Sequence, residues 1–146
     1  MSDLSIELPD PAATSGVAGR PRVLRLAAPR RRNALTLETV DHLLAELDED
    51  PRGVLLLGSS TPDIFSAGAD LAADDRTRAT LSDRLYACYE RMITRPGPVI
   101  AVVEGAAVGG GAQLCAAADI RVASPDARWR WAGPGHGLAV GGWILP

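Results

Sequence analysis

Aromatic side chains and cysteines are scarce in this sequence, and positive charge is not in excess. The formal net charge is -3 and the pI is near 5.3, so no broad electrostatic attraction to nucleic acid or to an anionic membrane is expected. No apolar run reaches the ~18 residues of a membrane span, and the first residues lack the basic and apolar regions of a signal peptide. We therefore expect a cytoplasmic protein that binds neither nucleic acid nor membrane.

The cysteines and histidines of the sequence do not indicate a metal site or a nucleophilic catalytic site. Cys88 and Cys115 lie inside apolar helical patterns without metal-ligand spacing, which favours a reducing compartment and free thiols. The histidines are His42 and His136 alone, too few for a zinc site or a recognisable catalytic triad. We expect no metal and no permanently bound cofactor.

What the sequence does contain is the composition of a globular protein, with 47% hydrophobic and 23% charged residues, at a length that fits one domain over residues 1–146. Helical spacing of apolar residues predicts a helix that begins near Thr36 and a second from about Leu81 to Met92. Short apolar runs predict strands between and after these helices. The predicted strands are Leu4–Leu8, Val23–Leu26, Val54–Leu57, Val99–Val103 and Ile120–Ala123, and a long loop is expected over Ser59–Asp70. Strands that alternate with helices indicate an α/β protein with largely parallel strands.

Two glycine-containing segments follow buried strands. The first is Phe65–Leu71 (FSAGADL), and the second is Gly105–Leu114 (GAAVGGGAQL), which also opens a helix. Glycine lets the backbone approach a ligand closely, and the first N–H groups of a helix have no internal acceptor and favour negative charge. A dinucleotide-binding loop is disfavoured because the G-x-G-x-x-G spacing is absent.

Together with Arg32–Leu35 (RNAL), Pro98–Gly105 and Ala118–Ala123, these segments resemble the crotonase (enoyl-CoA hydratase/isomerase) superfamily from about Val23 to about Gly142. The resemblance implies a ββα-spiral core, incomplete at the C-terminus, that binds an acyl-CoA thioester. It also implies a homo-oligomer, a trimer or hexamer in full-length relatives, and coenzyme A that arrives as part of the substrate.

Within this resemblance, the backbone N–H groups of Ala69 and Gly110 correspond to the oxyanion hole that holds the thioester carbonyl oxygen. The nearby thioester and pantetheine path is expected to be lined by Ala67, Gly68, Asp70, Leu71 and Gly109. Arg30 or Arg32 is expected to approach the nucleotide end, although a short basic run is also typical of a solvated turn.

The sequence departs from the family where hydratases carry two glutamates. Gln113 occupies the first position, and Gly133 aligns with the second. Neither residue exchanges a proton at neutral pH, so ordinary hydration by two carboxylates is disfavoured. His136 is a candidate base, although a lone histidine in a glycine-rich loop is more often incidental. Gln113 could orient water or bind a substrate carbonyl or carboxylate, and it could equally be a tolerated polar residue in the first turn of a helix.

The tryptophans near the end of the sequence and the aspartate of the first glycine-containing segment have structural interpretations. Trp129 and Trp131 alternate with arginines; they could wall an acyl pocket, but packing of one strand face on the core is the default expectation. Asp70 is expected to support its loop rather than to catalyse.

Two functional hypotheses remain open. The chain could be an acyl-CoA enzyme, a lyase or isomerase of fatty acid metabolism, with atypical proton transfer. Decarboxylation of a malonyl-type thioester would need no protein base. Alternatively, it could be a non-catalytic acyl-CoA-binding or assembly paralogue, or a truncated inactive product.

Overall fold

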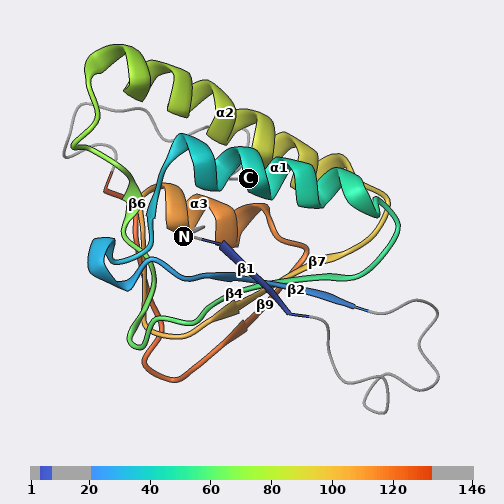
Figure 1. The fold of residues 1–146 in the computed structure, drawn as a ribbon. Helices are drawn as coiled ribbons and strands as arrows, with labels where there is room; N and C mark the ends of the chain where they lie inside the picture. Colours follow the sequence, from blue (N-terminus) through green and yellow to red (C-terminus); the bar gives the residue numbers. More distant parts are fainter. Residues whose placement is uncertain (1–3, 8–20, 133–146) are drawn as a thin grey trace.

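The computed structural model describes residues 4–7 and 21–132, which form a mixed α/β fold (Figure 1). The strands are β1 (Leu4–Glu7), β2 (Arg22–Leu26), β3 (Ala34–Leu35), β4 (Leu55–Ser59), β5 (Ile64–Ser66), β6 (Gly68–Ala69), β7 (Val99–Val103), β8 (Ala106–Val108), β9 (Ile120–Ala123) and β10 (Arg128–Arg130). The helices are α1 (Leu37–Glu49), α2 (Asp75–Thr94) and α3 (Gly110–Ala117), with a short 3-10 helix, η2 (Pro29–Arg31). No helix in this part of the chain combines the length and the hydropathy that crossing a membrane requires.

The strands form one large sheet and two small ones. The large sheet has the order β1-β2-β4-β7-β9, with β1 antiparallel to β2 and every other pair parallel. A second sheet, β10-β8-β5, is parallel throughout, and β3 pairs in parallel with β6. Three times between β2 and α3, the chain adds a strand to the large sheet, then one or two short strands elsewhere, then a helix, which confirms the expected ββα repeat.

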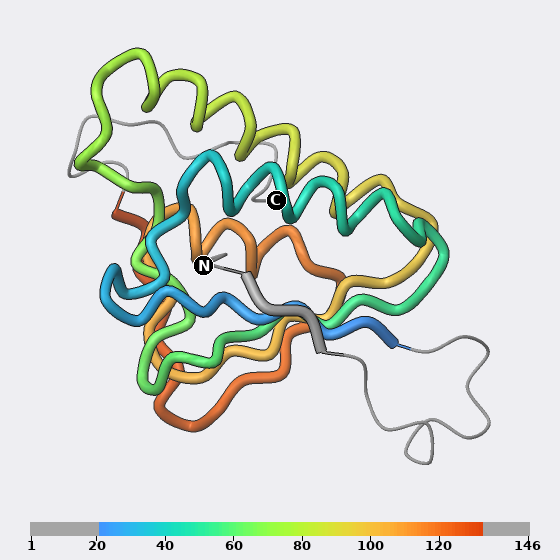
Figure 2. The backbone as a smooth tube through the Cα atoms, viewed as in Figure 1, coloured from blue at the N-terminus to red at the C-terminus, as the bar shows by residue number. Residues whose placement is uncertain are grey.

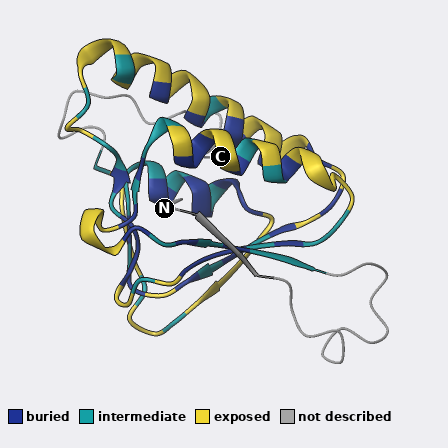
Figure 3. Cartoon of the chain, in the orientation of Figure 1, coloured by how far each residue is buried: buried dark blue, intermediate teal, exposed yellow. Residues whose placement is uncertain are grey.

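All three helices lie on one side of the large sheet (Figure 1). Both long helices have capped N-termini, because Thr36 Oγ1 accepts from Thr39 N at 3.2 Å and Asp74 Oδ1 accepts from Thr77 N at 2.9 Å. Figure 3 shows buried stripes along the helices where they face the sheet and each other. The apolar positions that predicted α1 and α2 are therefore core positions: Val40, Leu43, Leu47, Leu81, Leu85, Cys88, Tyr89 and Met92.

Helices α1 and α2 run parallel to each other. Arg84 pairs with Asp41 at 3.4 Å, and Arg91 pairs with Asp48 at 2.9 Å. The second ion pair lies seven residues further along both helices than the first, so the two helices run in the same direction. Parallel neighbouring helices follow from parallel strands that are joined by crossovers of the same hand.

Two sequence-based expectations were wrong. The segment expected to be one long loop over residues 59–70 contains β5 and β6, which pair with strands distant in the sequence. The tryptophans at 129 and 131 were expected on a strand face packed on the core, but they are 40% and 38% exposed. Trp129 belongs to β10, which is the outer strand of its sheet and is exposed at every residue.

Candidate functional site

Two segments distant in the sequence meet at the carboxyl ends of β5 and β8. These strands pair in parallel, with Ile64 opposite Ala106 and Ser66 opposite Ala107, and Figure 2 shows the two stretches of chain side by side. The residues that follow each strand are therefore brought together. They are the two glycine-containing segments that the sequence singled out.

The backbones of Ala69 and Gly110 approach each other closely. A Cβ atom placed on Gly110 would lie 3.5 Å from the Ala69 nitrogen, and one placed on Gly68 would lie 3.2 Å from the Gly110 nitrogen. A side chain at position 68 would also lie 2.6 Å from the Val108 carbonyl oxygen, so the approach requires glycine there. Gly68 has φ of 91°, a conformation that other residues rarely adopt.

Helix α3 begins at this junction. Its first intrahelical bond runs from Gln113 N to Gly109 O at 3.0 Å, so the N–H groups of residues 110–112 have no acceptor within the helix. The helix dipole adds partial positive charge at the same end. The N-terminus of α3 is therefore a favourable position for a ligand oxygen that carries negative charge.

Asn33 holds the arginine turn against this region. It is buried and has φ of 53°; its Oδ1 accepts from Ala28 N at 2.8 Å, and its Nδ2 donates to Phe65 O at 3.0 Å. Ser66 Oγ donates to the Asn33 carbonyl at 2.7 Å and accepts from Gly68 N at 3.1 Å. One buried amide thus links the turn before α1 to the strand that leads into the site.

Arg31, rather than the arginines on either side of it, forms an ion pair with Asp70 of the segment that follows β6. Its guanidinium lies 3.8 Å from a carboxylate oxygen of Asp70, whose other oxygen accepts from Ala72 N at 3.0 Å. Arg30 and Arg32 are exposed in the same turn. Asp70 therefore orders its own loop and connects it to the arginine turn.

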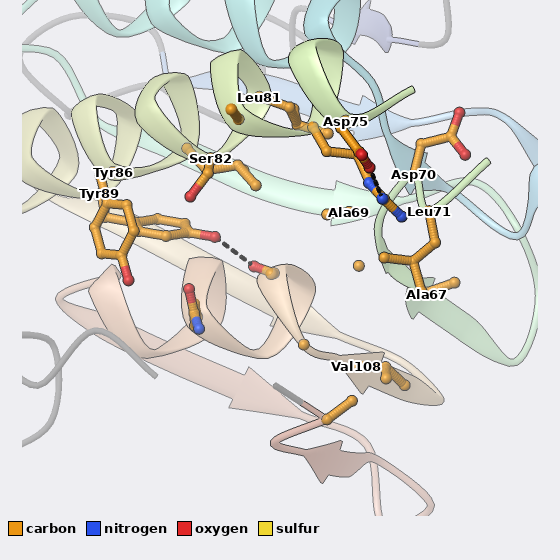
Figure 4. Close-up of a pocket in the computed structure, with 18 residues that line it drawn as sticks. Ala67, Ala69, Asp70, Leu71, Asp75, Leu81, Ser82, Tyr86, Tyr89 and Val108 are labelled. Carbon is orange, nitrogen blue, oxygen red and sulfur yellow. Dashed lines mark hydrogen bonds and ion pairs between the residues drawn. The ribbon is translucent and has the colours of Figure 1, made fainter. Parts of the chain in front are cut away.

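A cavity of about 810 Å³ opens where α2, α3 and the β5–β6 segment meet (Figure 4). Its lining combines backbone from both glycine segments with one face of α2. The lining residues are Ala67, Gly68, Ala69, Asp70, Leu71, Asp75, Arg78, Ala79, Leu81, Ser82, Leu85, Tyr86, Tyr89, Val108, Gly109, Gly110, Gln113 and Ala132.

The polar side chains of the cavity lie mainly on α2. Asp75 pairs with Arg78 at the start of the helix, and both are exposed. Tyr86 and Tyr89 pack edge to face, with ring centroids 6.1 Å apart, and the Tyr89 hydroxyl donates to Gly110 O at 3.2 Å. Burial raises the pKa of Tyr89 well above its ordinary value, so this hydroxyl remains protonated. No three acidic, histidine or cysteine side chains in the described part of the chain group as metal ligands would.

Most residues that the sequence placed at the site do line this cavity. They are Ala67, Gly68, Ala69, Asp70, Leu71, Gly109, Gly110 and Gln113. Gln113 is half-buried on α3, whereas Arg30 and Arg32 are not among the lining residues. Gly133 and His136 lie outside the described residues.

The contribution of α2 to the cavity was not predicted from the sequence. Ser82, Tyr86 and Tyr89 recur at spacings of four and three residues, which places three hydroxyl groups on one helix face. This pattern was available in the sequence, although only the structure shows that the face meets the glycine segments.

Comparison with known proteins gives a consistent result. Residues 19–146 match the family described as enoyl-CoA hydratase/isomerase. The chain is 36% identical over 126 residues to a protein of Mycobacterium bovis named a probable enoyl-CoA hydratase, with 84% of this chain and 51% of that protein covered. It is 32% identical over 133 residues to a short-chain-enoyl-CoA hydratase of Clostridium acetobutylicum, with 84% and 50% covered.

Among solved structures, the fold matches an enoyl-CoA hydratase of Thermoplasma volcanium with a TM-score of 0.76 and 29% identity, over 97% of this chain and 58% of that one. The chain spans about half the length of the curated relatives that it matches.

Proposed function

The chain belongs to the enoyl-CoA hydratase/isomerase family, and from that premise we propose that its cavity binds an acyl-CoA thioester through the N–H groups of Ala69 and Gly110. The observation that carries the proposal is the close approach of these two backbones at the mouth of α3, where a Cβ on Gly110 would lie 3.5 Å from the Ala69 nitrogen. One thioester oxygen could accept from both.

The chemistry of a thioester suits this arrangement. Abstraction of a proton next to the carbonyl, loss of CO₂ from that carbon, or addition across a conjugated double bond each places negative charge on the carbonyl oxygen. Fixed N–H donors stabilise that charge without reorganisation, and loss of one such donor typically costs about 3 kcal/mol. The unpaired N–H groups at the start of α3 act in the same direction.

The remainder of the ligand would extend from the same point. Ala67, Gly68, Asp70, Leu71 and Gly109 would line the thioester and pantetheine path. Arg30 or Arg32 would meet the phosphates at the nucleotide end, and Asp70 would hold the neighbouring arginine turn through its ion pair with Arg31.

Proton transfer would be atypical. Gln113 stands where hydratases of the family carry one glutamate, and Gly133 where they carry the other. Asp70 and Asp75 are the carboxylates among the described lining residues, and each is paired with an arginine. We therefore favour a reaction that needs no carboxylate base, such as decarboxylation of a malonyl-type thioester, with His136 as the alternative base.

The binding step is tested by comparing butyryl-CoA with S-butyl-CoA, a thioether in which a methylene replaces the carbonyl. We expect the thioester to bind at least tenfold more tightly, because the thioether offers no oxygen to the two N–H groups. Gly110→Ala should reduce that preference, since the new methyl group would lie 3.5 Å from the Ala69 nitrogen. Equal affinities for the two ligands in the unmodified chain would contradict the proposal.

A non-catalytic acyl-CoA-binding protein is the second candidate, favoured by the pairing of both aspartates in the lining. Incubation with a panel of enoyl- and malonyl-type CoA esters separates the two. Turnover of any ester supports the enzyme, whereas tight thioester binding without turnover of the panel supports the binding protein.

A further inference from the structure

Tyr89 forms a hydrogen bond to the residue that supplies one of the two proposed donors. Its side chain is 1% exposed, it extends from α2 across the cavity, and its hydroxyl lies 3.2 Å from the Gly110 carbonyl oxygen (Figure 4). The contact joins two elements that lie 21 residues apart in the sequence. The bond ends on a backbone atom, so it restrains the main chain of α3 rather than another side chain.

The Gly110 carbonyl matters because glycine cannot fix its own conformation. Residues 109, 110 and 111 are all glycine, so no Cβ atom restricts φ and ψ in this stretch. The peptide before Gly110 is anchored, since Gly109 N donates to Arg130 O at 2.8 Å and Gly109 O accepts from Gln113 N at 3.0 Å. Tyr89 anchors the peptide that follows.

The Gly110 N–H belongs to the peptide that is held at Gly109 O, and Tyr89 holds the next peptide, so the two bonds together restrain the direction of this N–H. The φ and ψ angles of Gly110 relate its N–H to its carbonyl group, so a bond that restrains the carbonyl also restrains the amide. Three groups surround Gly110 so closely that little room is left for a side chain. A Cβ on Gly110 would lie 3.2 Å from the Tyr89 hydroxyl, 3.3 Å from a methyl carbon of Leu35 and 3.5 Å from the Ala69 nitrogen.

We infer that Tyr89 is a positioning residue for the Gly110 N–H, and that its hydroxyl sets how strongly the cavity distinguishes a ligand carbonyl oxygen from a methylene group. This inference rests on the proposed function, because it assigns the Gly110 amide to the thioester oxygen. Tyr89 itself does not contact the reacting atoms in this role.

A Tyr89 hydroxyl that only stabilises the core would affect ligand binding differently from one that positions the Gly110 N–H. The Tyr89 ring packs against Tyr86 and lies within the hydrophobic core, and Tyr89→Phe keeps that ring. A purely structural hydroxyl would change stability and would weaken both ligands together. A positioning hydroxyl would weaken only the ligand that has a carbonyl oxygen.

The experiment measures dissociation constants of butyryl-CoA and S-butyl-CoA for the unmodified chain, Tyr89→Phe and Tyr86→Phe. We expect Tyr89→Phe to lose about three- to tenfold of the thioester preference while its affinity for the thioether stays constant. Tyr86→Phe removes a hydroxyl from the neighbouring ring and leaves the bond to Gly110 intact, so any change it makes should affect both ligands equally.

The outcomes separate the two proposals. If the unmodified chain shows no thioester preference, the proposed function fails and this inference fails with it. If the preference exists and Tyr89→Phe retains all of it, only the role of Tyr89 is overturned. A Tyr89→Phe chain that does not fold assigns the hydroxyl to core stability and likewise overturns the inference.

Discussion

Gly105 and Gly109 flank β8, and both have positive φ, 72° and 52°, yet a side chain would meet very different surroundings at the two positions. A Cβ on Gly105 would lie 2.1 Å from the carbonyl carbon of Asp63, which is a backbone overlap that no rotamer change relieves. Among the residues that the structure describes, a Cβ on Gly109 would meet nothing closer than the Ala132 methyl group at 4.0 Å. The same residue type therefore serves close packing at one position and backbone conformation at the other.

This difference predicts unequal costs for two alanine substitutions. Gly109→Ala should lower the free energy of unfolding by about 1 to 3 kcal/mol, the cost of a disfavoured backbone conformation. Gly105→Ala adds the overlap with Asp63 and should cost more than about 4 kcal/mol or prevent folding. Urea titration of both variants measures the difference, and equal costs would show that the Asp63 backbone does not approach as closely as described.

At the scale of elements, α3 depends on a neighbouring strand. It is short and ends at Ala117, so its last carbonyl groups need partners from outside the helix. Arg121 of β9 supplies them: its guanidinium donates to Cys115 O at 3.1 Å and Ala118 O at 2.7 Å. A cation at a helix C-terminus is also favoured by the helix dipole.

Arg121→Met should therefore destabilise the chain by about 1 to 2 kcal/mol, because it keeps the aliphatic part of the side chain but removes the donors. Arg128→Met is the matched control, since the Arg128 guanidinium donates to the carbonyl of nearby Asp126 at an exposed site, and it should cost less than about 0.5 kcal/mol. Urea unfolding measures both variants, and amide hydrogen exchange should show the loss of protection concentrated in α3. Similar costs for the two substitutions would contradict the capping role.

The sequence predicted the elements that carry their own periodic signal and missed those that depend on a distant partner. Helices α1 and α2 were predictable because their apolar residues recur at helical spacing and end at Asp50 and Arg95. Strands β5 and β6 are only three and two residues long and exist through pairing with β8 and β3, so no local pattern marks them. The resemblance to a family predicted several residues that line the cavity, but the contacts of Tyr89 and Arg31 required the structure.

For the whole molecule, the arrangement of layers determines both the site and the stability. Strands β2, β4, β7 and β9 run parallel, so the segments that leave them emerge at one edge of the sheet, where ligands of α/β proteins commonly bind. The space between sheet and helices is filled by one apolar cluster, and both cysteines belong to it. Burial raises the pKa of Cys88 and of Cys115 to about 12.

These buried thiols make stability depend on pH in a window where little else titrates. The sequence has 15 arginines and no lysine, so no lysine loses its charge between pH 8 and 9.5. In the unfolded chain each thiol releases its proton near pH 9.0, whereas in the folded chain it keeps the proton until about pH 12. Above pH 9 the unfolded state binds fewer protons than the folded state, so stability must fall as pH rises.

Integration of this linkage from pH 8 to 9.5 predicts a loss of about 0.8 kcal/mol per thiol, or about 1.6 kcal/mol for the chain. Urea unfolding at the two pH values measures the loss directly. The double variant Cys88→Ala/Cys115→Ala should be less stable at pH 8, because each substitution leaves a small cavity, but its stability should change little between the two pH values. A loss as large in the double variant as in the unmodified chain would mean that other groups titrate on unfolding, and that the thiols are not held protonated by burial between the sheet and the helices.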